Sequence, residues 1–192
     1  MYELLRFLFK KIFYVIFRCK EKGVENIPLE GGVIIAANHL SLWDPPLAAT
    51  YVPRHVHFMA KEELFKIPLF GILIKKLYAF PVRRGAADRS AIRTAIQLLK
   101  DGRCLGLFPE GTRNKNGTIG KPEPGVALIA VKAGVPIIPT AVIGTNKLLG
   151  PFEVRYGKAI LFDSEQADKV QLQAFSEKIM QEIRTLYNEQ DR

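Results

Sequence analysis

The stretch Gly31-Gly32-Val33-Ile34-Ile35-Ala36-Ala37 is a short apolar run opened by glycines, and Asn38 and His39 follow it directly. A continuous apolar run of this length is typical of a strand that is buried on both faces, as in the interior of a parallel sheet. His39 is then expected at the carboxyl end of this strand, the edge of an open α/β sheet at which ligands bind. Pro45 and Pro46 come soon after and predict a tight corner in place of an immediate regular helix.

His39 and Asp44 are the candidate catalytic pair of this loop. A histidine titrates near neutral pH and can take a proton from an alcohol when a partner on its other ring nitrogen fixes the ring. Asp44 lies a few residues further along, across a turn, and is suited to that role. The alternative is structural, because an asparagine and histidine at a strand end, or an aspartate before a proline, are also common in caps and turns.

A second polar loop follows a second apolar run. Residues 104–108 read CLGLF, and Pro109-Glu110-Gly111-Thr112-Arg113 come next. Because parallel strands end at the same edge of a sheet, we expect this loop beside His39. Gly111 allows a close backbone approach to an anion, and Arg113 carries a planar fork suited to phosphate or carboxylate. A surface turn with a solvated arginine is the alternative.

Two neighbouring arginines form a third candidate anion site. Residues 79–82 read AFPV and predict a short strand that ends at Arg83 and Arg84. Adjacent guanidinium groups repel each other unless an anion lies near them, so the pair either binds phosphate or stays solvated.

These loops resemble the motifs of a known family, the 1-acylglycerol-3-phosphate O-acyltransferases, or lysophosphatidic acid acyltransferases. Asn38–Pro45 is similar to the family's H-x4-D motif and Phe108–Arg113 to its F-P-E-G-T-R motif. Residues 135–140 resemble its proline-containing fourth motif. The pair Arg83-Arg84 resembles the second motif, although Arg83 stands where the family usually has an acidic residue if Arg84 takes the position of its arginine. The resemblance covers about residues 23–162.

The resemblance implies transfer of a fatty acyl group to the free hydroxyl of 1-acylglycerol 3-phosphate, which gives phosphatidic acid in phospholipid biosynthesis. The donor would be a thioester of acyl carrier protein or of coenzyme A, and no other cofactor and no metal are expected. His39 would be the base and Asp44 its orienting group. The remaining residues implied to shape the phosphate site are Arg83, Arg84, Glu110, Gly111, Thr112 and Arg113. No serine lies in a G-x-S-x-G elbow, which favours direct transfer over a covalent acyl-enzyme.

Composition and pattern predict one α/β domain with anionic partners. The chain has 192 residues and a net charge of +9, which favours phosphoesters, anionic lipid or nucleic acid as partners. It carries no helix-turn-helix or RNA-binding signature and no P-loop, so nucleic acid is not expected. Cys19 and Cys104 are far apart, which indicates reduced thiols in a cytosolic setting. Strands alternate with helices after Gly31, which predicts a largely parallel sheet flanked by helices.

Residues 1–22 are predicted to form an N-terminal amphipathic helix ahead of an acyltransferase domain at 23–192. Basic residues interrupt the apolar ones too often for a transmembrane helix, and no small-residue cleavage site follows for a signal peptide. A helix at an anionic membrane surface is expected, which places the protein at the cytoplasmic face of the cell membrane as a peripheral or monotopic protein. A helix packed on the core is the alternative.

Other interpretations stay open. The apolar residues among the lysines of 61–76 either bury in the core or line a groove for an acyl chain. His55 and His57 have no acidic or thiol cluster near them in the sequence and are interpreted as structural or surface residues. Two alternatives for the function are a related O-acyltransferase with another lysolipid acceptor and a non-catalytic basic module that binds membranes.

Overall fold

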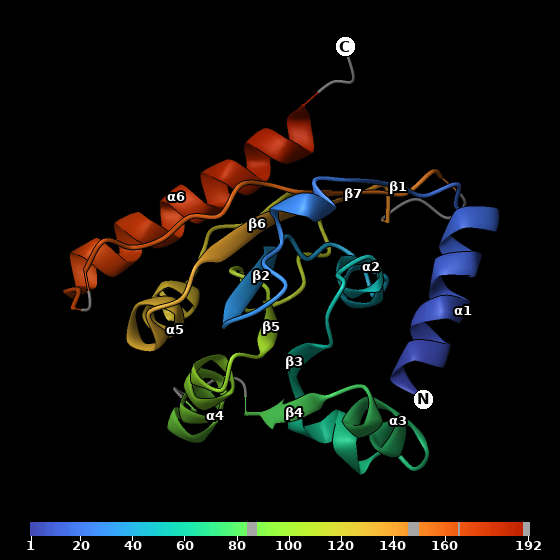
Figure 1. Ribbon diagram of the computed structural model, residues 1–192, viewed down its shortest axis with the longest axis horizontal. Coiled ribbons are helices and arrows are strands. Elements are labelled where there is room, and N and C mark those ends of the chain that lie inside the picture. Colours follow the sequence, from blue (N-terminus) through green and yellow to red (C-terminus); the bar gives the residue numbers. More distant parts are fainter. Residues whose placement is uncertain (84–87, 146–149, 165, 190–192) are drawn as a thin grey trace.

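Seven strands form a single sheet at the centre of the molecule (Figure 1). The computed structural model describes residues 1–83, 88–145, 150–164 and 166–189. The strands are β1 (Lys20–Lys22), β2 (Val33–Ala37), β3 (Val56–Lys61), β4 (Ala79–Val82), β5 (Cys104–Leu107), β6 (Ile137–Ile143) and β7 (Glu153–Tyr156). Their order is β1-β7-β6-β2-β5-β3-β4, and every neighbouring pair is parallel except β6 and β7.

Helices cover both faces of this sheet. They are α1 (Tyr2–Val15), α2 (Asp44–Thr50), α3 (Phe70–Lys76), α4 (Arg89–Lys100), α5 (Gly125–Ala133) and α6 (Lys169–Asn188), with short 3₁₀ helices η1 (Val24–Asn26) and η2 (Glu62–Lys66). The helices α1 and α2 pack on one face, and α4, α5 and α6 pack on the other (Figure 1). The predicted α/β domain with a largely parallel sheet is therefore confirmed.

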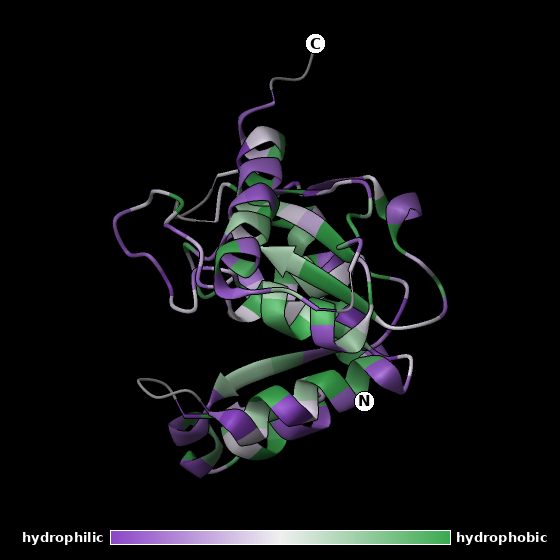
Figure 2. Cartoon of the chain, turned by 90° about the vertical axis from the view of Figure 1, so that its left-hand side faces the viewer, coloured by the Kyte–Doolittle hydropathy of each residue, from purple (hydrophilic) through white to green (hydrophobic). Residues whose placement is uncertain are grey.

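Strand β2 lies in the interior of the sheet, and the side chains on both of its faces are buried. Val33 and Ile35 pack with α1 and α2, whereas Ile34 and Ala36 pack with the side chains of α4, α5 and α6. Successive side chains of a strand point to opposite faces, so a strand in this position needs an unbroken apolar run. In Figure 2 the central strands are accordingly mostly green, the colour of hydrophobic residues.

Strand β6 accommodates a proline although it lies inside the sheet. The carbonyl of Pro139 points toward β7 and accepts the N–H of Gly157 at 2.8 Å. The paired register with β7 begins one residue later, where Thr140 lies opposite Tyr156. The missing N–H of Pro139 therefore falls between the β6–β7 ladder and the antiparallel bridge of Ile137 with Ile160.

Two local predictions were wrong. The helix expected over residues 1–22 ends at Val15, and Lys20–Lys22 instead pairs with β7 as an edge strand, held in place by the buried side chains of Phe17 and Cys19. Pro45 and Pro46 do not delay the next helix, which begins at Asp44 with the two prolines in its first turn. The N–H groups of a first turn have no partner inside the helix, so prolines are tolerated there.

Candidate active site

The imidazole of His39 lies against the carboxylate of Asp44, as the sequence predicts. The distance from His39 Nδ1 to Asp44 Oδ2 is 3.2 Å, and both residues are buried. His39 follows β2 directly, while Asp44 is the first residue of α2. With Nδ1 directed at Asp44, the second ring nitrogen, Nε2, is left to exchange a proton with a substrate.

Four groups surround the carboxylate of Asp44. Besides the imidazole of His39, its Oδ2 accepts the backbone N–H groups of Leu40 at 2.5 Å and Ser41 at 2.6 Å. Its Oδ1 accepts the hydroxyl of Thr145 at 2.5 Å. A buried carboxylate with so many donors has one orientation, and it transfers that orientation to the imidazole.

The two polar loops are joined through the backbone of His39. The N–H of His39 donates to Glu110 Oε1 at 2.9 Å, and the carbonyl of His39 accepts the N–H of Asn114, also at 2.9 Å. Because β2 and β5 are adjacent and parallel, both loops leave the same edge of the sheet. The prediction that the second loop lies beside His39 is confirmed.

Glu110 holds loops together through both of its carboxylate oxygens. While Oε1 accepts from His39, Oε2 accepts the N–H of Gly120 at 3.1 Å. Burial raises the pKa of Glu110, and the two backbone hydrogen bonds oppose that rise. Glu110 thus shapes the site by positioning the backbone of His39 and of Gly120.

Arg113 lies between the two residues that bind the backbone of His39. Glu110 precedes it and Asn114 follows it, so the main chain at Arg113 is fixed next to the loop of His39. The side chain of Arg113 is half-buried. An arginine held in this way is available to an anionic ligand.

The other predicted phosphate residues lie in different settings. Gly111 has φ 65°, and its N–H donates to the carbonyl of Phe108 at 2.9 Å, so Gly111 forms part of a turn. Thr112, the next residue, is exposed. Arg83 is 77% exposed at its side chain and pairs with Glu62 at 2.9 Å. Arg83 follows β4, and β4 is the third strand from β2 in the sheet. At the usual spacing of strands, the two strands are roughly 14 Å apart. Arg84 lies outside the described residues.

Three residues that were not predicted from the sequence complete the site. Thr145 reaches Asp44 from the end of β6. The side chain of Asn38 donates to the carbonyl of Val142 at 2.9 Å and accepts its N–H at 2.8 Å, which joins the loop of His39 to β6. Phe108 stacks on the imidazole of His39 with ring centroids 4.1 Å apart. Thr145 could have been found by its position, because it follows a predicted buried strand of the same sheet.

Helix α1 contacts the loop of His39 through Trp43, which lies between His39 and Asp44 in the sequence. The ring of Trp43 is 6.0 Å from that of Phe13 and 5.6 Å from that of Phe17. The alternative that this helix packs on the core is thus correct for its inner side. The loop that carries His39 is therefore supported by the N-terminal segment.

Other nucleophiles and ligands are poorly placed. Burial raises the pKa of the thiols of Cys19 and Cys104 to about 11 and about 12, so neither is a thiolate near neutral pH. His55 binds Glu3, and His57 lies 3.2 Å from the carbonyl of Cys104. Among the residues that the structure describes, no group of histidine, cysteine and carboxylate side chains could hold a metal ion.

Comparisons with known proteins agree with this geometry. Residues 18–143 match the family model described as Acyltransferase. The chain is 36% identical over 177 residues to the 1-acyl-sn-glycerol-3-phosphate acyltransferase of Bacillus subtilis, and the match covers 87% of each protein. It is 40% identical over 119 residues to the enzyme of that name from Streptococcus pneumoniae, covering 61% of this chain and 44% of that one.

A solved structure is similar over the whole chain. It is the crystal structure of the 1-acyl-sn-glycerophosphate (LPA) acyltransferase PlsC from Thermotoga maritima, with a TM-score of 0.80 and 29% identity. The match covers 100% of this chain and 81% of that one. The fold, the paired loops and the two sequence comparisons lead to one conclusion: the chain is an enzyme of the acyltransferase family that includes the 1-acylglycerol-3-phosphate O-acyltransferases.

Proposed function

We propose that this acyltransferase moves a fatty acyl group from an acyl thioester to the free hydroxyl of 1-acylglycerol 3-phosphate, giving phosphatidic acid. The observation that carries the proposal is the backbone connection between His39 and the loop of Arg113. It supports the proposal because a candidate base for an alcohol and an arginine suited to phosphate lie on loops that are joined by hydrogen bonds. The names of the relatives from B. subtilis and S. pneumoniae support the same acceptor.

The reaction needs a single proton carrier. With a proton on Nδ1 toward Asp44, Nε2 of His39 takes the proton of the acceptor hydroxyl as its oxygen attacks the thioester carbonyl. A carbon–oxygen bond forms and the carbon–sulfur bond breaks. The imidazolium then returns the proton to the leaving thiolate, so His39 ends the cycle neutral. Asp44 stabilises the transient positive charge.

The phosphate of the acceptor is assigned first to Arg113. Its strand, β5, is the direct neighbour of β2, whereas Arg83 follows a strand two positions further away. Arg83 also has a carboxylate partner in Glu62. A phosphomonoester beside His39 is therefore within easier reach of Arg113, and Arg83 and Arg84 form an outer cationic region. Glu110, Gly111 and Thr112 shape the turn that presents Arg113.

The donor and the location complete the proposal. The acyl group comes from acyl carrier protein or coenzyme A, and no further cofactor takes part. The outer side of α1 carries exposed apolar and basic residues, which fits a peripheral or monotopic protein at the cytoplasmic face of the membrane. None of the helices within the described ranges has the length and apolar character to cross a bilayer.

The test is an acyl-transfer assay with purified protein and vesicles that contain 1-acylglycerol 3-phosphate. Acyl carrier protein and coenzyme A thioesters are supplied in separate reactions, and His39→Ala is measured in parallel. Phosphatidic acid from the parent, with a loss of about 10²- to 10⁴-fold in the variant, is expected. Full activity of a folded His39→Ala protein would show that His39 is not the base. If product forms only from lysolipids that lack a phosphomonoester, the acceptor is one of those lysolipids and not 1-acylglycerol 3-phosphate.

A further inference from the structure

The segment 66–76, which contains α3, presents apolar side chains to solvent. Leu69 is 80% exposed and Ile72 57% exposed, and they have apolar neighbours on the same segment. The further exposed apolar residues are Ile67, Phe70 and Leu73. Gly71 is the buried residue of α3. Single exposed apolar residues are normal, but a contiguous group of them indicates a binding surface.

The backbone of this segment packs closely against the preceding 3₁₀ helix, η2. Leu69 has φ 62°, a conformation that costs a leucine free energy. A Cβ atom at Gly71 would lie 2.3 Å from the carbonyl oxygen of Phe65, so α3 packs directly against η2 at this point. Of the two uses considered for residues 61–76, burial in the core does not apply to these side chains.

Helix α1 has a matching outer side. Its inner side packs through Phe9 and Phe13, whereas apolar residues at helical spacing face solvent on the other side. These outward residues are Leu4, Phe7, Leu8, Tyr14 and Val15, each at least half exposed. Lys11 falls on the same side of the helix by its spacing, and exposed Arg18 follows the helix. An apolar outward side with basic residues is the reverse of an ordinary surface helix.

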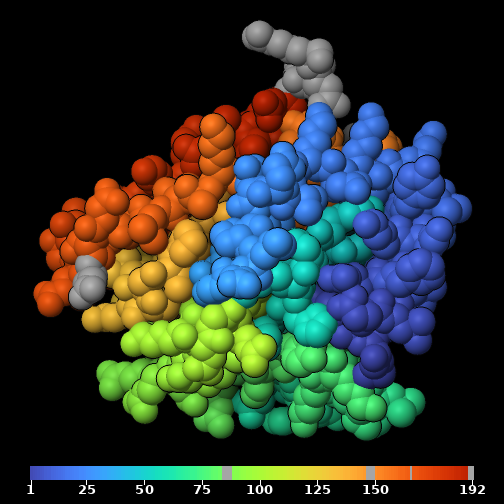
Figure 3. Space-filling model, viewed as in Figure 1, coloured from blue at the N-terminus to red at the C-terminus, as the bar shows by residue number. Residues whose placement is uncertain are grey.

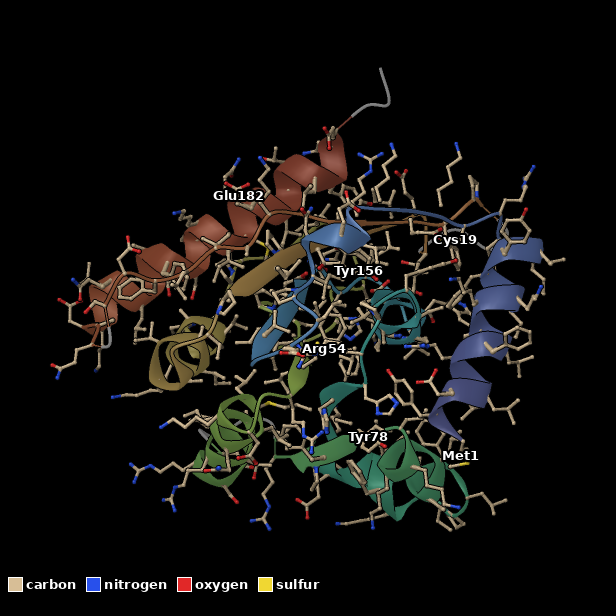
Figure 4. The ribbon with its side chains drawn as sticks, viewed as in Figure 1. Met1, Cys19, Arg54, Tyr78, Tyr156 and Glu182 are labelled. Atoms are coloured by element: carbon tan, nitrogen blue, oxygen red, sulfur yellow. The ribbon has the colours of Figure 1, made fainter. Side chains whose placement is uncertain are left out.

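The two surfaces adjoin one another. The ring of Tyr2, in α1, lies 5.5 Å from that of Tyr78, two residues after α3. His55 stacks on Tyr78 with ring centroids 5.1 Å apart and lies 4.5 Å from Tyr2. In Figure 3 the dark-blue N-terminal residues border the green segment, and Figure 4 places Met1 and Tyr78 on the same side of the molecule.

We propose that the segment 66–76 is a second membrane contact, which together with the outer side of α1 docks the enzyme on a bilayer that carries anionic headgroups. Exposed Lys66 precedes the apolar residues, and exposed Lys75 and Lys76 follow them. The partner must therefore be apolar at its centre and anionic at its rim, which describes acyl chains beneath anionic headgroups. The inference rests on the proposed function, in which α1 lies on the membrane.

Two contacts fix an orientation that one helix cannot. A single amphipathic helix allows the protein to rotate about the helix axis, whereas two elements joined at Tyr2 and Tyr78 define a plane. Because α1 also packs on Trp43, this plane brings the loop of His39 toward the bilayer, where a lysolipid with a long acyl chain resides.

The test is binding of the full chain to vesicles of phosphatidylcholine with and without phosphatidylglycerol. We expect Leu69→Ser/Ile72→Ser to lower the partition coefficient by about tenfold or more, because each side chain loses a large part of its transfer free energy. The matched control is Leu29→Ser/Val170→Ser, two residues that are 71% and 77% exposed outside both surfaces and should bind like the parent. Equal binding of the two double variants would overturn the proposal.

Two further measurements separate charge from apolar contact, and docking from catalysis. Lys75→Gln/Lys76→Gln should weaken binding only when phosphatidylglycerol is present, and no change there would contradict the anionic partner. Acyl transfer in detergent micelles should be equal for the parent and Leu69→Ser/Ile72→Ser. If the parent makes no phosphatidic acid yet the double variant loses vesicle binding, docking stands and the proposed reaction fails.

Discussion

The hydroxyl of Thr145 donates a 2.5 Å hydrogen bond to Oδ1 of Asp44, a residue 101 positions earlier in the chain. Both groups are buried, and Oδ2 of the same carboxylate faces the imidazole of His39. The orientation of the candidate base is therefore fixed from β6 as well as from its own loop.

Thr145→Val tests this connection. The valine keeps the shape of threonine but leaves one buried carboxylate oxygen without its donor, which costs about 1 to 3 kcal/mol. We expect kcat to fall by about tenfold or more and the thermal midpoint to fall as well, while KM for the acceptor changes little. Thr145→Ser retains the hydroxyl and should restore most of kcat. Unchanged kcat in the valine variant would limit Thr145 to a structural role.

Asp44→Asn should reduce activity more strongly than Thr145→Val. An amide nitrogen at this position would face N–H or O–H donors, because both carboxylate oxygens of Asp44 accept. Misdirection of the imidazole should lower kcat with a smaller effect on KM. Steady-state kinetics of the folded variant check this, and near-parental kcat would show that His39 does not need the carboxylate.

Glu110→Gln should separate the two polar loops. A glutamine accepts with one oxygen only, so either the N–H of His39 or that of Gly120 loses its partner. We expect a loss of stability of about 1 to 3 kcal/mol and a lower kcat. Urea denaturation and acyl-transfer rates measure the two effects. A stable, fully active variant would show that the loops stay together without this carboxylate.

The pH dependence of stability should also change in Glu110→Gln. Burial raises the pKa of Glu110 above its ordinary value of 4.5, so the folded protein binds this proton more tightly than the unfolded chain does. The stability that Glu110 gains from this tighter proton binding is fully present below the pKa of Glu110 in the unfolded chain. It is lost as pH rises through the pKa of Glu110 in the folded protein. The stability of the parent relative to the variant should therefore decrease across that window, in denaturation curves recorded from acid to neutral pH.

Arg113→Ala should weaken binding of the phosphorylated acceptor and so raise its KM. Loss of a charge-assisted contact corresponds to about 1.5 to 3 kcal/mol, or about 10- to 100-fold in kcat/KM. Arg83→Ala should have a smaller effect, since Arg83 is exposed and already paired with Glu62. Arg93→Ala, on the exposed side of α4, is the control. An equal effect of the Arg83 and Arg113 substitutions would argue against the assignment of the phosphate to Arg113.

Trp43 is the single tryptophan of the chain and a natural reporter of docking. It is 40% exposed and contacts α1. Vesicles that contain phosphatidylglycerol should shift its emission to shorter wavelength, and brominated lipid should quench it. Both signals should weaken in Leu69→Ser/Ile72→Ser at equal lipid concentration. Emission that does not change with saturating vesicles would place the catalytic loop away from the bilayer.

The sequence predicts the sheet and the His39 loop well because both depend on local patterns. Unbroken apolar runs mark β2 and β5, and the parallel topology brings their polar ends together. Lys20–Lys22 has no apolar alternation, so its pairing with β7 is specified by distant partners and not by its own residues. The position of Thr145 after a buried strand predicts the edge of the sheet at which it lies, but its contact with Asp44 depends on strand order, which no local pattern contains.

The place of β2 between β5 and β6 affects how the enzyme is assembled. Its neighbour β6 begins at Ile137, so the second edge of the strand that carries His39 is paired only after most of the chain has been made. Pairings over such long sequence separations form slowly, because a large loop must close before any contact is gained. During synthesis on the ribosome, Asp44 meets Thr145 only after residue 145 has emerged, so a shorter nascent chain lacks the hydrogen bond that fixes Oδ1 of this carboxylate.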